Sequence, residues 1–233
     1  MFSGNVEIEL CAQEEAQSLL PSGVTEILND PERKQFEKFR SPKRRQEWFA
    51  GRLAAKRLVR RKLGGSGSRI SLQDIRILAR ESGEPCVELP PSFEVQWRYP
   101  LSISHSGRYA VAALAGVGKR VGADVETVAP REKSWLELVA HDSEIFPGLR
   151  EDAVGQTVLW TLKEAVVKAL GVGLSVGFSD VRFLRGAALG ASRLEFHGKA
   201  RRIWEDMGRP DFAFESAMLD DRSAISVAYT CSD

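Results

Sequence analysis

A long helix whose two ends are both marked in the sequence is the strongest constraint on the fold. Ser41 followed by Pro42 favours a helix start, because serine caps the first turn and proline fits the first helical position. The glycine-rich stretch 64–67 is a stop signal. The sequence therefore predicts one helix over about 42–63, and its apolar periodicity predicts a second long helix over 151–170.

Most other segments have the alternation and turn residues of short strands. The expected strands are 4–10, 70–80, 101–104, 109–115, 120–126 and most of 174–230, with helices over 133–146 and near 199–207 and two helical stretches in 11–39 broken near Pro21 and Pro31. Strands mixed with long helices, without strict alternation, favour an α+β fold. We expect two halves of similar size, an N-terminal subdomain over 1–115 and a C-terminal subdomain over 116–233, each a small antiparallel sheet packed with a long helix.

Charge and cysteine content narrow the class of protein. The chain has 33 Lys and Arg against 32 Asp and Glu, so its net charge of +1 does not point to nucleic acid or to an anionic membrane. It lacks a run of about 18 apolar residues, so we expect no membrane span. Three distant cysteines fit reduced thiols better than a disulfide framework. We therefore expect a cytoplasmic protein.

Two carboxylates lie two residues apart in the predicted strand 120–126. Residues i and i+2 of a strand point to the same face, so Asp124 and Glu126 project together. Like charges at this distance repel unless a cation or a proton lies between them. Oxygen ligands in small number suit Mg²⁺, which keeps waters and phosphate oxygens in its shell. The alternative is a solvated face of an edge strand.

A tryptophan, a glutamate and a lysine share one face of the predicted helix 151–170. Trp160, Glu164 and Lys168 follow each other at intervals of four residues. Glu164 is a candidate third carboxylate or general base, and Lys168 is a candidate phosphate contact. The alternative is a simple glutamate–lysine pair on a helix surface, worth a few tenths of a kcal/mol.

The predicted helix 42–63 is strongly basic on one side. At 100° per residue, Arg45, Arg52 and Lys56 form a stripe, which is a candidate clamp for an anion. A solvated basic face and a nucleic-acid contact are the alternatives, and the net charge weakens the second.

A histidine follows the predicted strand 101–104. His105, flanked by Ser104 and Ser106-Gly107, can present an imidazole and backbone N–H groups to an anion. A serine hydrolase is disfavoured, because neighbouring residues of a strand point to opposite faces and Ser104 and His105 make a poor nucleophile–base pair.

Taken together, and in their order along the chain, these motifs resemble those of the Sfp-type 4′-phosphopantetheinyl transferases. The resemblance rests on the helix segment 48–56, Gly83-Glu84-Pro85, Ser104-His105-Ser106, Gly122-x-Asp124-x-Glu126 and Trp160-x-x-Lys163-Glu164-Ala165-x-x-Lys168. The last two motifs are the most specific. The resemblance implies a pseudo-symmetric fold of two similar halves, usually monomeric, with coenzyme A bound in the cleft between them.

The resemblance also implies a reaction and roles for particular residues. The reaction is Mg²⁺-dependent transfer of the 4′-phosphopantetheine moiety from coenzyme A to a serine of an acyl or peptidyl carrier protein, releasing 3′,5′-ADP. Asp124, Glu126 and Glu164 would surround Mg²⁺ on the pyrophosphate. Lys168 would contact a pyrophosphate oxygen. Glu164 is our choice as proton acceptor, directly or through a water, with Glu126 second.

The nucleotide end of coenzyme A would meet the N-terminal half. His105 and a basic residue of helix 42–63 would hold the 3′-phosphate, Ser104 would line the nucleotide site, and Gly83-Glu84-Pro85 would lie against the adenine. Arg44, Arg45, Arg52 and Lys56 are the candidates for this basic residue, with Arg45 and Arg52 preferred.

The chain departs from the family at two positions. Some relatives have an arginine where this chain has Glu47, and the family commonly has Gly-Lys-Pro where Glu84 replaces the lysine. This reversal of charge leaves open a catalytically silent paralogue that binds coenzyme A or a carrier protein. A second alternative, based on the basic helix 42–63, is a nucleic-acid-binding module.

Overall fold

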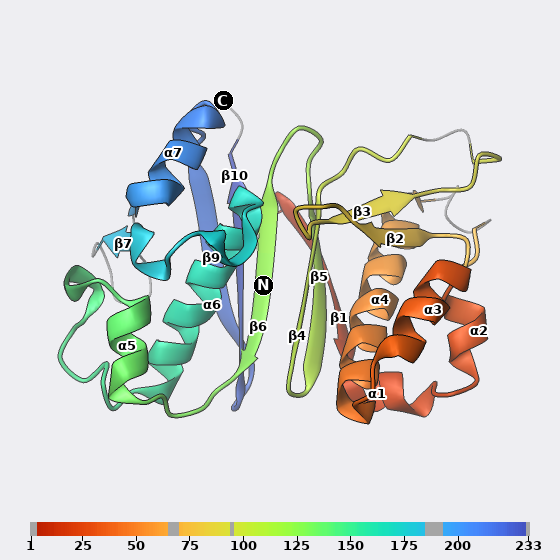
Figure 1. Ribbon diagram of the computed structural model, residues 1–233, viewed down its shortest axis with the longest axis horizontal. Helices are drawn as coiled ribbons and strands as arrows, with labels where there is room; N and C mark the ends of the chain where they lie inside the picture. Colours follow the sequence, from red (N-terminus) through yellow and green to blue (C-terminus); the bar gives the residue numbers. More distant parts are fainter. Residues whose placement is uncertain (1–3, 65–69, 94–95, 185–192, 232–233) are drawn as a thin grey trace. The chain divides into compact units, whose positions relative to one another are not determined.

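The computed structural model describes residues 4–64, 70–93, 96–184 and 193–231. The chain divides into two compact units, Phe2–Gly118 and Lys119–Asp233. Each unit holds a three-stranded antiparallel sheet, a two-stranded hairpin and a long helix (Figure 1). The expectation of an α+β fold is therefore confirmed. None of the helices in the described part of the chain is both long and apolar enough to cross a membrane.

The N-terminal unit is built on a sheet with strand order β1-β5-β4. Its elements are β1 (Val6–Ala12), α1 (Gln13–Ser18), α2 (Gly23–Ile27), α3 (Asp30–Lys38), α4 (Pro42–Lys62), β2 (Arg76–Ala79), β3 (Pro85–Glu88), β4 (Leu101–Ser106) and β5 (Tyr109–Ala115). Helix α4 packs on this sheet and buries Phe49, Leu53 and Leu58 completely or nearly so. The unit's core therefore lies between α4 and the sheet.

Helix α4 begins where the sequence predicts, because the Ser41 hydroxyl accepts a hydrogen bond from the Arg44 N–H at 3.4 Å. Residues 65–67 of the expected stop signal lie outside the described residues. Before α4 the prediction of two helices is wrong, since the structure has three. Pro31 lies in the first turn of α3, where a missing N–H costs nothing, and so begins a helix instead of breaking one.

The C-terminal unit repeats the pattern with strand order β6-β10-β9. Its elements are β6 (Val121–Thr127), α5 (Lys133–Val139), η2 (Asp142–Glu144), α6 (Ala153–Leu170), η3 (Gly173–Ser175), η4 (Phe178–Asp180), β7 (Val181–Leu184), β8 (Arg193–Phe196), α7 (Gly198–Asp206), β9 (Phe212–Asp220) and β10 (Ser223–Thr230). Helix α6 packs on the sheet and buries Ala165, Val166 and Ala169. In both units the first strand is at an edge and the last strand is central.

Two predicted elements are shorter in the structure. The helix expected over 133–146 ends at Val139, because His141 and Glu144 form a capping box that starts the separate turn η2. The strand expected over 70–80 is limited to Arg76–Ala79. Before it, the Ser71 hydroxyl bonds both the carboxylate and the backbone N–H of Asp74 and folds that segment into a turn.

Candidate active site

The site in the C-terminal unit is set by a close approach of β6 to α6. Gly122, Asp124 and Glu126 share one face of β6. A Cβ added to Gly122 would lie 1.9 Å from the Ala165 carbonyl oxygen and 2.6 Å from the Ala169 nitrogen. No other residue fits at this position, so glycine lets the backbone of α6 rest directly on the strand that carries the two carboxylates.

Lys168 of α6 reaches this strand. Its Nζ donates to Asp124 Oδ1 at 2.6 Å and to the Ala123 carbonyl at 3.1 Å. The Asp124 side chain is 5% exposed, whereas that of Lys168 is 29% exposed. The ammonium therefore lies at the boundary between the buried carboxylate and the surface, where a point charge can still meet an anion.

Glu164 lies one turn before Lys168 and is half-buried. Burial raises the pKa of Glu164, Lys168 opposes the rise, and the charges of Asp124 and Glu126 add to it. The structure therefore places all three carboxylates predicted for a metal in one electrostatic environment with Lys168.

The donor types at this site fit Mg²⁺. Its preferred ligands are oxygens, and Asp124, Glu126 and Glu164 are carboxylates whose charges affect one another. Within residues 4–64, 70–93, 96–184 and 193–231, no three His, Cys, Asp or Glu side chains are gathered into a group that could itself hold a metal ion. Phosphate oxygens and waters would therefore have to complete the shell, as is usual for Mg²⁺.

Trp160, the third residue predicted on this face of α6, packs in an aromatic cluster. Its ring centroid lies 5.7 Å from that of Trp135 and 4.7 Å from that of Phe178. The guanidinium of Arg131 lies 5.2 Å from the Trp135 ring centroid. The tryptophan therefore supports the first half of α6 by packing.

Ser104 and His105 lie on β4 in the N-terminal unit. Ser104 is buried, and the His105 side chain is 36% exposed with its Nδ1 3.9 Å from Glu47 Oε2. Gly51 of α4 makes room for this strand, since a Cβ there would lie 3.1 Å from the Ile103 methyl group and 3.7 Å from the His105 ring. The imidazole is thus held against the first half of α4 with part of its surface open.

Gly83, Glu84 and Pro85 form the tip of the β2–β3 hairpin. Gly83 has φ +87°, a conformation that favours glycine, and its N–H donates to the Arg80 carbonyl at 2.9 Å. The Arg80 N–H donates in turn to the Glu84 carbonyl at 2.9 Å. The predicted turn is therefore present, and its role in binding stays a prediction.

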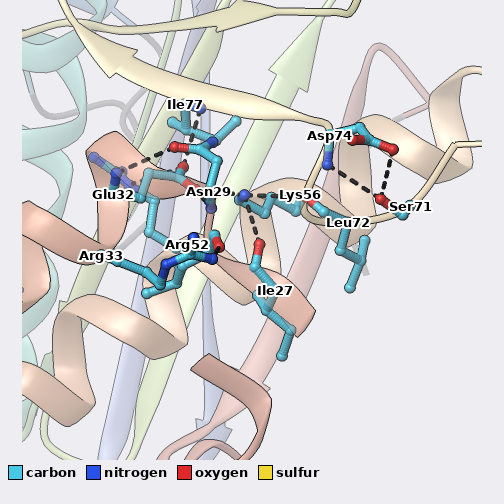
Figure 2. A network of polar contacts seen from close by, with 11 residues as sticks. Ile27, Asn29, Glu32, Arg33, Arg52, Lys56, Ser71, Leu72, Asp74 and Ile77 are labelled. Atoms are coloured by element: carbon cyan, nitrogen blue, oxygen red, sulfur yellow. Dashed lines mark hydrogen bonds and ion pairs between the residues drawn. The ribbon is translucent and has the colours of Figure 1, made fainter. Parts of the chain in front are cut away.

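The structure does not support Lys56 as part of the anion clamp predicted on α4. The Lys56 side chain is 0% exposed, with Nζ 2.5 Å from Glu32 Oε2, 2.7 Å from the Ile27 carbonyl and 3.0 Å from the Leu72 carbonyl (Figure 2). All three ammonium protons are used inside the unit. Lys56 is therefore structural and is not retained as a coenzyme A contact.

Arg45 and Arg52 also have internal partners. Arg45 Nε donates to the Phe39 carbonyl at 2.6 Å, at the end of α3. The guanidinium of Arg52 lies over the Trp48 ring, and its Nε is 3.9 Å from Glu32 Oε1. Their phosphate contacts stay predictions, but the two residues do not form a free cationic stripe.

The rest of the basic helix is partly neutralised by acidic side chains from the start of the chain. Ion pairs join Arg57 to Glu15, Arg61 to Glu9 and Lys62 to Glu7. These pairs lower the net positive charge available to a polyanion, so they weaken the nucleic-acid alternative.

Sequence reasoning missed the acidic partners of two buried lysines. Glu32 pairs with Lys56, and Glu144 pairs with Lys163 at 2.7 Å. One signal was available, because Asn29 and Glu32 have the spacing of a capping box and both of its hydrogen bonds are present. For Glu144 the capping residue is His141, which is not a usual capping type.

Comparison with known proteins shows which family this chain matches. The model of the 4′-phosphopantetheinyl transferase superfamily matches residues 120–209. A holo-[acyl-carrier-protein] synthase of Anoxybacillus flavithermus is 40% identical over 108 residues, which are 46% of this chain and 87% of the relative. A phosphopantetheinyl transferase of Thraustochytrium sp. is 27% identical over 218 residues, covering 86% of this chain and 69% of the relative.

Among solved structures, the chain is similar to a holo-(acyl-carrier-protein) synthase from Bacillus anthracis in complex with CoA (3′,5′-ADP). The identity is 27% and the TM-score 0.40, over 47% of this chain and 92% of that chain.

Proposed function

Because this chain belongs to the 4′-phosphopantetheinyl transferase superfamily, we propose that it transfers 4′-phosphopantetheine from coenzyme A to a serine of an acyl or peptidyl carrier protein. We further propose that the reaction requires Mg²⁺ and releases 3′,5′-ADP. The observation that carries the proposal is the ion pair of Lys168 with Asp124, one helical turn from Glu164. All three residues lie inside the segment matched by the family model.

The proposed reaction replaces one phosphorus–oxygen bond with another. The carrier serine oxygen bonds to the phosphorus next to pantetheine, and the bond from this phosphorus to the bridging oxygen breaks. The electron pair leaves with the bridging oxygen as 3′,5′-ADP, and the serine proton goes to a base. Such a reaction needs charge neutralisation and in-line placement more than covalent catalysis.

Lys168 is proposed to stabilise the leaving group. Its ammonium is fixed by Asp124 and the Ala123 carbonyl and so needs little reorganisation when negative charge develops on the bisphosphate. Bound Mg²⁺ would neutralise the pyrophosphate oxygens, with Asp124, Glu126 and Glu164 as its protein ligands.

Glu164 is proposed as the proton acceptor, directly or through a water. A glutamate bound to Mg²⁺ is a poorer base than a free one, which favours proton transfer through a water. Glu126 is the second choice. Glu126 lies near the C-terminal end of strand β6 and is partly exposed.

The nucleotide end of coenzyme A is proposed to contact Ser104, His105 and the Gly83-Glu84-Pro85 turn. The partly open imidazole of His105 can donate to a 3′-phosphate when protonated. Arg45 and Arg52 remain in this proposal for a second phosphate contact. We propose that the protein acts as a monomer in the cytoplasm, without nucleic-acid or membrane partners.

The test is the intact mass of an apo carrier protein after incubation with this protein, coenzyme A and Mg²⁺. We expect a gain of about 340 Da, the mass of the phosphopantetheine group, and no gain with EDTA. Coenzyme A binding without a gain on acyl or peptidyl carriers would support the silent paralogue instead. A gain that persists in EDTA would contradict the metal requirement.

A further inference from the structure

Helix α6 is anchored on the side opposite its contact with β6. Lys163 and Ala165 are 200° apart around the helix, at 100° per residue, and Ala165 faces Gly122. Lys163 is 0% exposed, and its Nζ donates to Glu144 Oε2 at 2.7 Å, to the Phe178 carbonyl at 3.0 Å and to the Val181 carbonyl at 2.6 Å. These bonds use all three ammonium protons.

Glu144 extends this anchor to two further elements. Its Oε2 also accepts from the His141 N–H at 2.8 Å, within η2, and its Oε1 accepts from the Phe183 N–H of β7 at 2.9 Å. We call Glu144 and Lys163 the C-terminal node. It joins α6 to η2 and to the hairpin, and both side chains are almost fully buried.

The N-terminal unit contains the same arrangement, which we call the N-terminal node and which consists of Glu32 and Lys56 (Figure 2). Lys56 of α4 meets the carboxylate of Glu32 and two carbonyls. Glu32 is in turn the acidic residue of a capping box and accepts from the Ile77 N–H of hairpin strand β2 at 3.1 Å. The two nodes match in three respects: each lysine lies on a long helix and makes three contacts, each glutamate belongs to a capping box, and each glutamate accepts from a hairpin strand. Glu32 differs in that Arg52 Nε also lies 3.9 Å from it.

The nodes differ in what their helices carry. Directly after Lys163, α6 carries Glu164 and then Lys168, the two residues on which the proposed transfer depends. The residue after Lys56 is Arg57, which pairs with Glu15. Only the C-terminal node therefore fixes a helix that holds the proposed metal and pyrophosphate contacts.

We propose that Lys163, through Glu144, is a positioning residue for the transfer reaction, because it fixes the rotation of α6 that places Glu164 and Lys168 beside Asp124. This inference rests on the proposed function. The contact at Gly122 sets the distance between α6 and β6 but leaves rotation about the helix axis to other contacts.

A small rotation suffices to disturb the site. Turning a helix by about 10° moves an atom about 6 Å from its axis by about 1 Å. A misplacement of about 1 Å can lower a rate by about 10²-fold. Loss of the node should therefore reduce turnover even in a protein that stays folded.

The test compares two matched double variants, Lys163→Met with Glu144→Gln, and Lys56→Met with Glu32→Gln. Removing both charges of the Glu144–Lys163 pair leaves no unpaired charge behind. The N-terminal variant also removes the carboxylate that lies 3.9 Å from Arg52, so kcat is compared at saturating coenzyme A, where a weaker phosphate contact does not lower it. Glutamine keeps an oxygen for the N–H groups of Phe183 or Ile77, and methionine fills most of the volume of lysine. Thermal unfolding compares the stability of the two variants.

Turnover at saturating coenzyme A and carrier protein is the first readout. We expect kcat to fall at least tenfold in the C-terminal variant and by less than threefold in the N-terminal variant, at similar thermal midpoints. Calorimetric titration with coenzyme A is the second readout. We expect the gain in affinity that Mg²⁺ gives the wild type to shrink only in the C-terminal variant.

Equal effects of the two variants on kcat, or none from the C-terminal variant, would overturn the positioning role. If the C-terminal double variant does not fold, Lys163→Arg takes its place, with a tenfold loss expected and a change below threefold overturning the inference. A wild type that neither modifies a carrier nor binds coenzyme A would refute the proposed function, and the inference with it. An active wild type with an unimpaired C-terminal variant would refute the inference alone.

Discussion

Substitution of Gly122 by alanine tests whether the close approach of α6 to β6 builds the site. The new Cβ would lie 1.9 Å from the Ala165 carbonyl oxygen, whereas an ordinary contact begins at 3.4 Å, so the helix must withdraw by about 1.5 Å. Both groups belong to backbone and cannot swing aside. The same movement would stretch the 2.6 Å contact between Lys168 Nζ and Asp124 Oδ1 beyond hydrogen-bonding distance.

The expected cost has two parts. Overpacking of this kind destabilises by about 2 kcal/mol, which lowers the thermal midpoint of a chain of this length by about 6 °C. Misplacement of Lys168 by more than about 1 Å should lower kcat by about 10²-fold. Intact-mass time courses with an apo carrier protein measure the rate, and thermal unfolding measures the stability.

Gly177 supplies the matched control in the same unit. It has φ −69°, and a Cβ added there would meet only the Ser179 hydroxyl at 3.8 Å. Gly177→Ala should change stability by less than about 0.5 kcal/mol and leave the rate unchanged. If Gly122→Ala behaved like this control, the close approach would not determine the position of Lys168 and our reasoning would be refuted.

Other predictions concern the charged residues of the site. Asp124→Asn should abolish transfer and leave the far-UV circular dichroism unchanged, and turnover like that of the wild type would remove Asp124 from the site. Lys168→Ala should lower kcat by about 10²-fold or more, about 3 kcal/mol of transition-state stabilisation, and a loss below threefold would exclude its proposed role. Because the pKa of Glu164 is raised above its ordinary 4.5, its contribution to stability is fully present below that value and is lost as the pH rises through the raised pKa. In the metal-free protein, the thermal midpoint of Glu164→Gln should therefore rise relative to the wild type between about pH 4 and pH 7, and a difference independent of pH would contradict the assignment.

Local signals predicted the parts of the site that are adjacent in sequence. The spacing of Asp124 and Glu126 follows from the two-residue period of a strand, and that of Glu164 and Lys168 from the turn of a helix. The start of α4 follows from Ser41 and Pro42. These features depend on neighbouring residues, so a single sequence is enough to find them.

Lys56 shows what helical periodicity alone does not predict. Helical periodicity places it on one stripe with Arg45 and Arg52, but angular position does not say what packs opposite. In the structure α3 supplies Glu32, the last residue of α2 supplies the carbonyl of Ile27, and the segment before β2 supplies the carbonyl of Leu72. One residue of the basic stripe predicted at the surface is therefore buried, because residues far away in the sequence bind its ammonium group.

The early end of α5 has a similar cause. Apolar residues continue beyond Val139, so periodicity extends the predicted helix to 146. The chain instead turns at His141, where the carboxylate of Glu144 is held by Lys163 of α6 and by the Phe183 N–H of β7. Tertiary bonds to the capping glutamate thus outweigh helix propensity.

The most direct test of the central claim is the amount of 3′,5′-ADP released per carrier protein modified. Wild-type protein, coenzyme A, Mg²⁺ and an apo carrier are incubated, and both products are quantified in the same sample, with Asp124→Asn run in parallel. We predict release and modification in a one-to-one ratio for the wild type and neither product for the variant. Release of 3′,5′-ADP without modification of the carrier, or equal modification by the variant, would contradict the account.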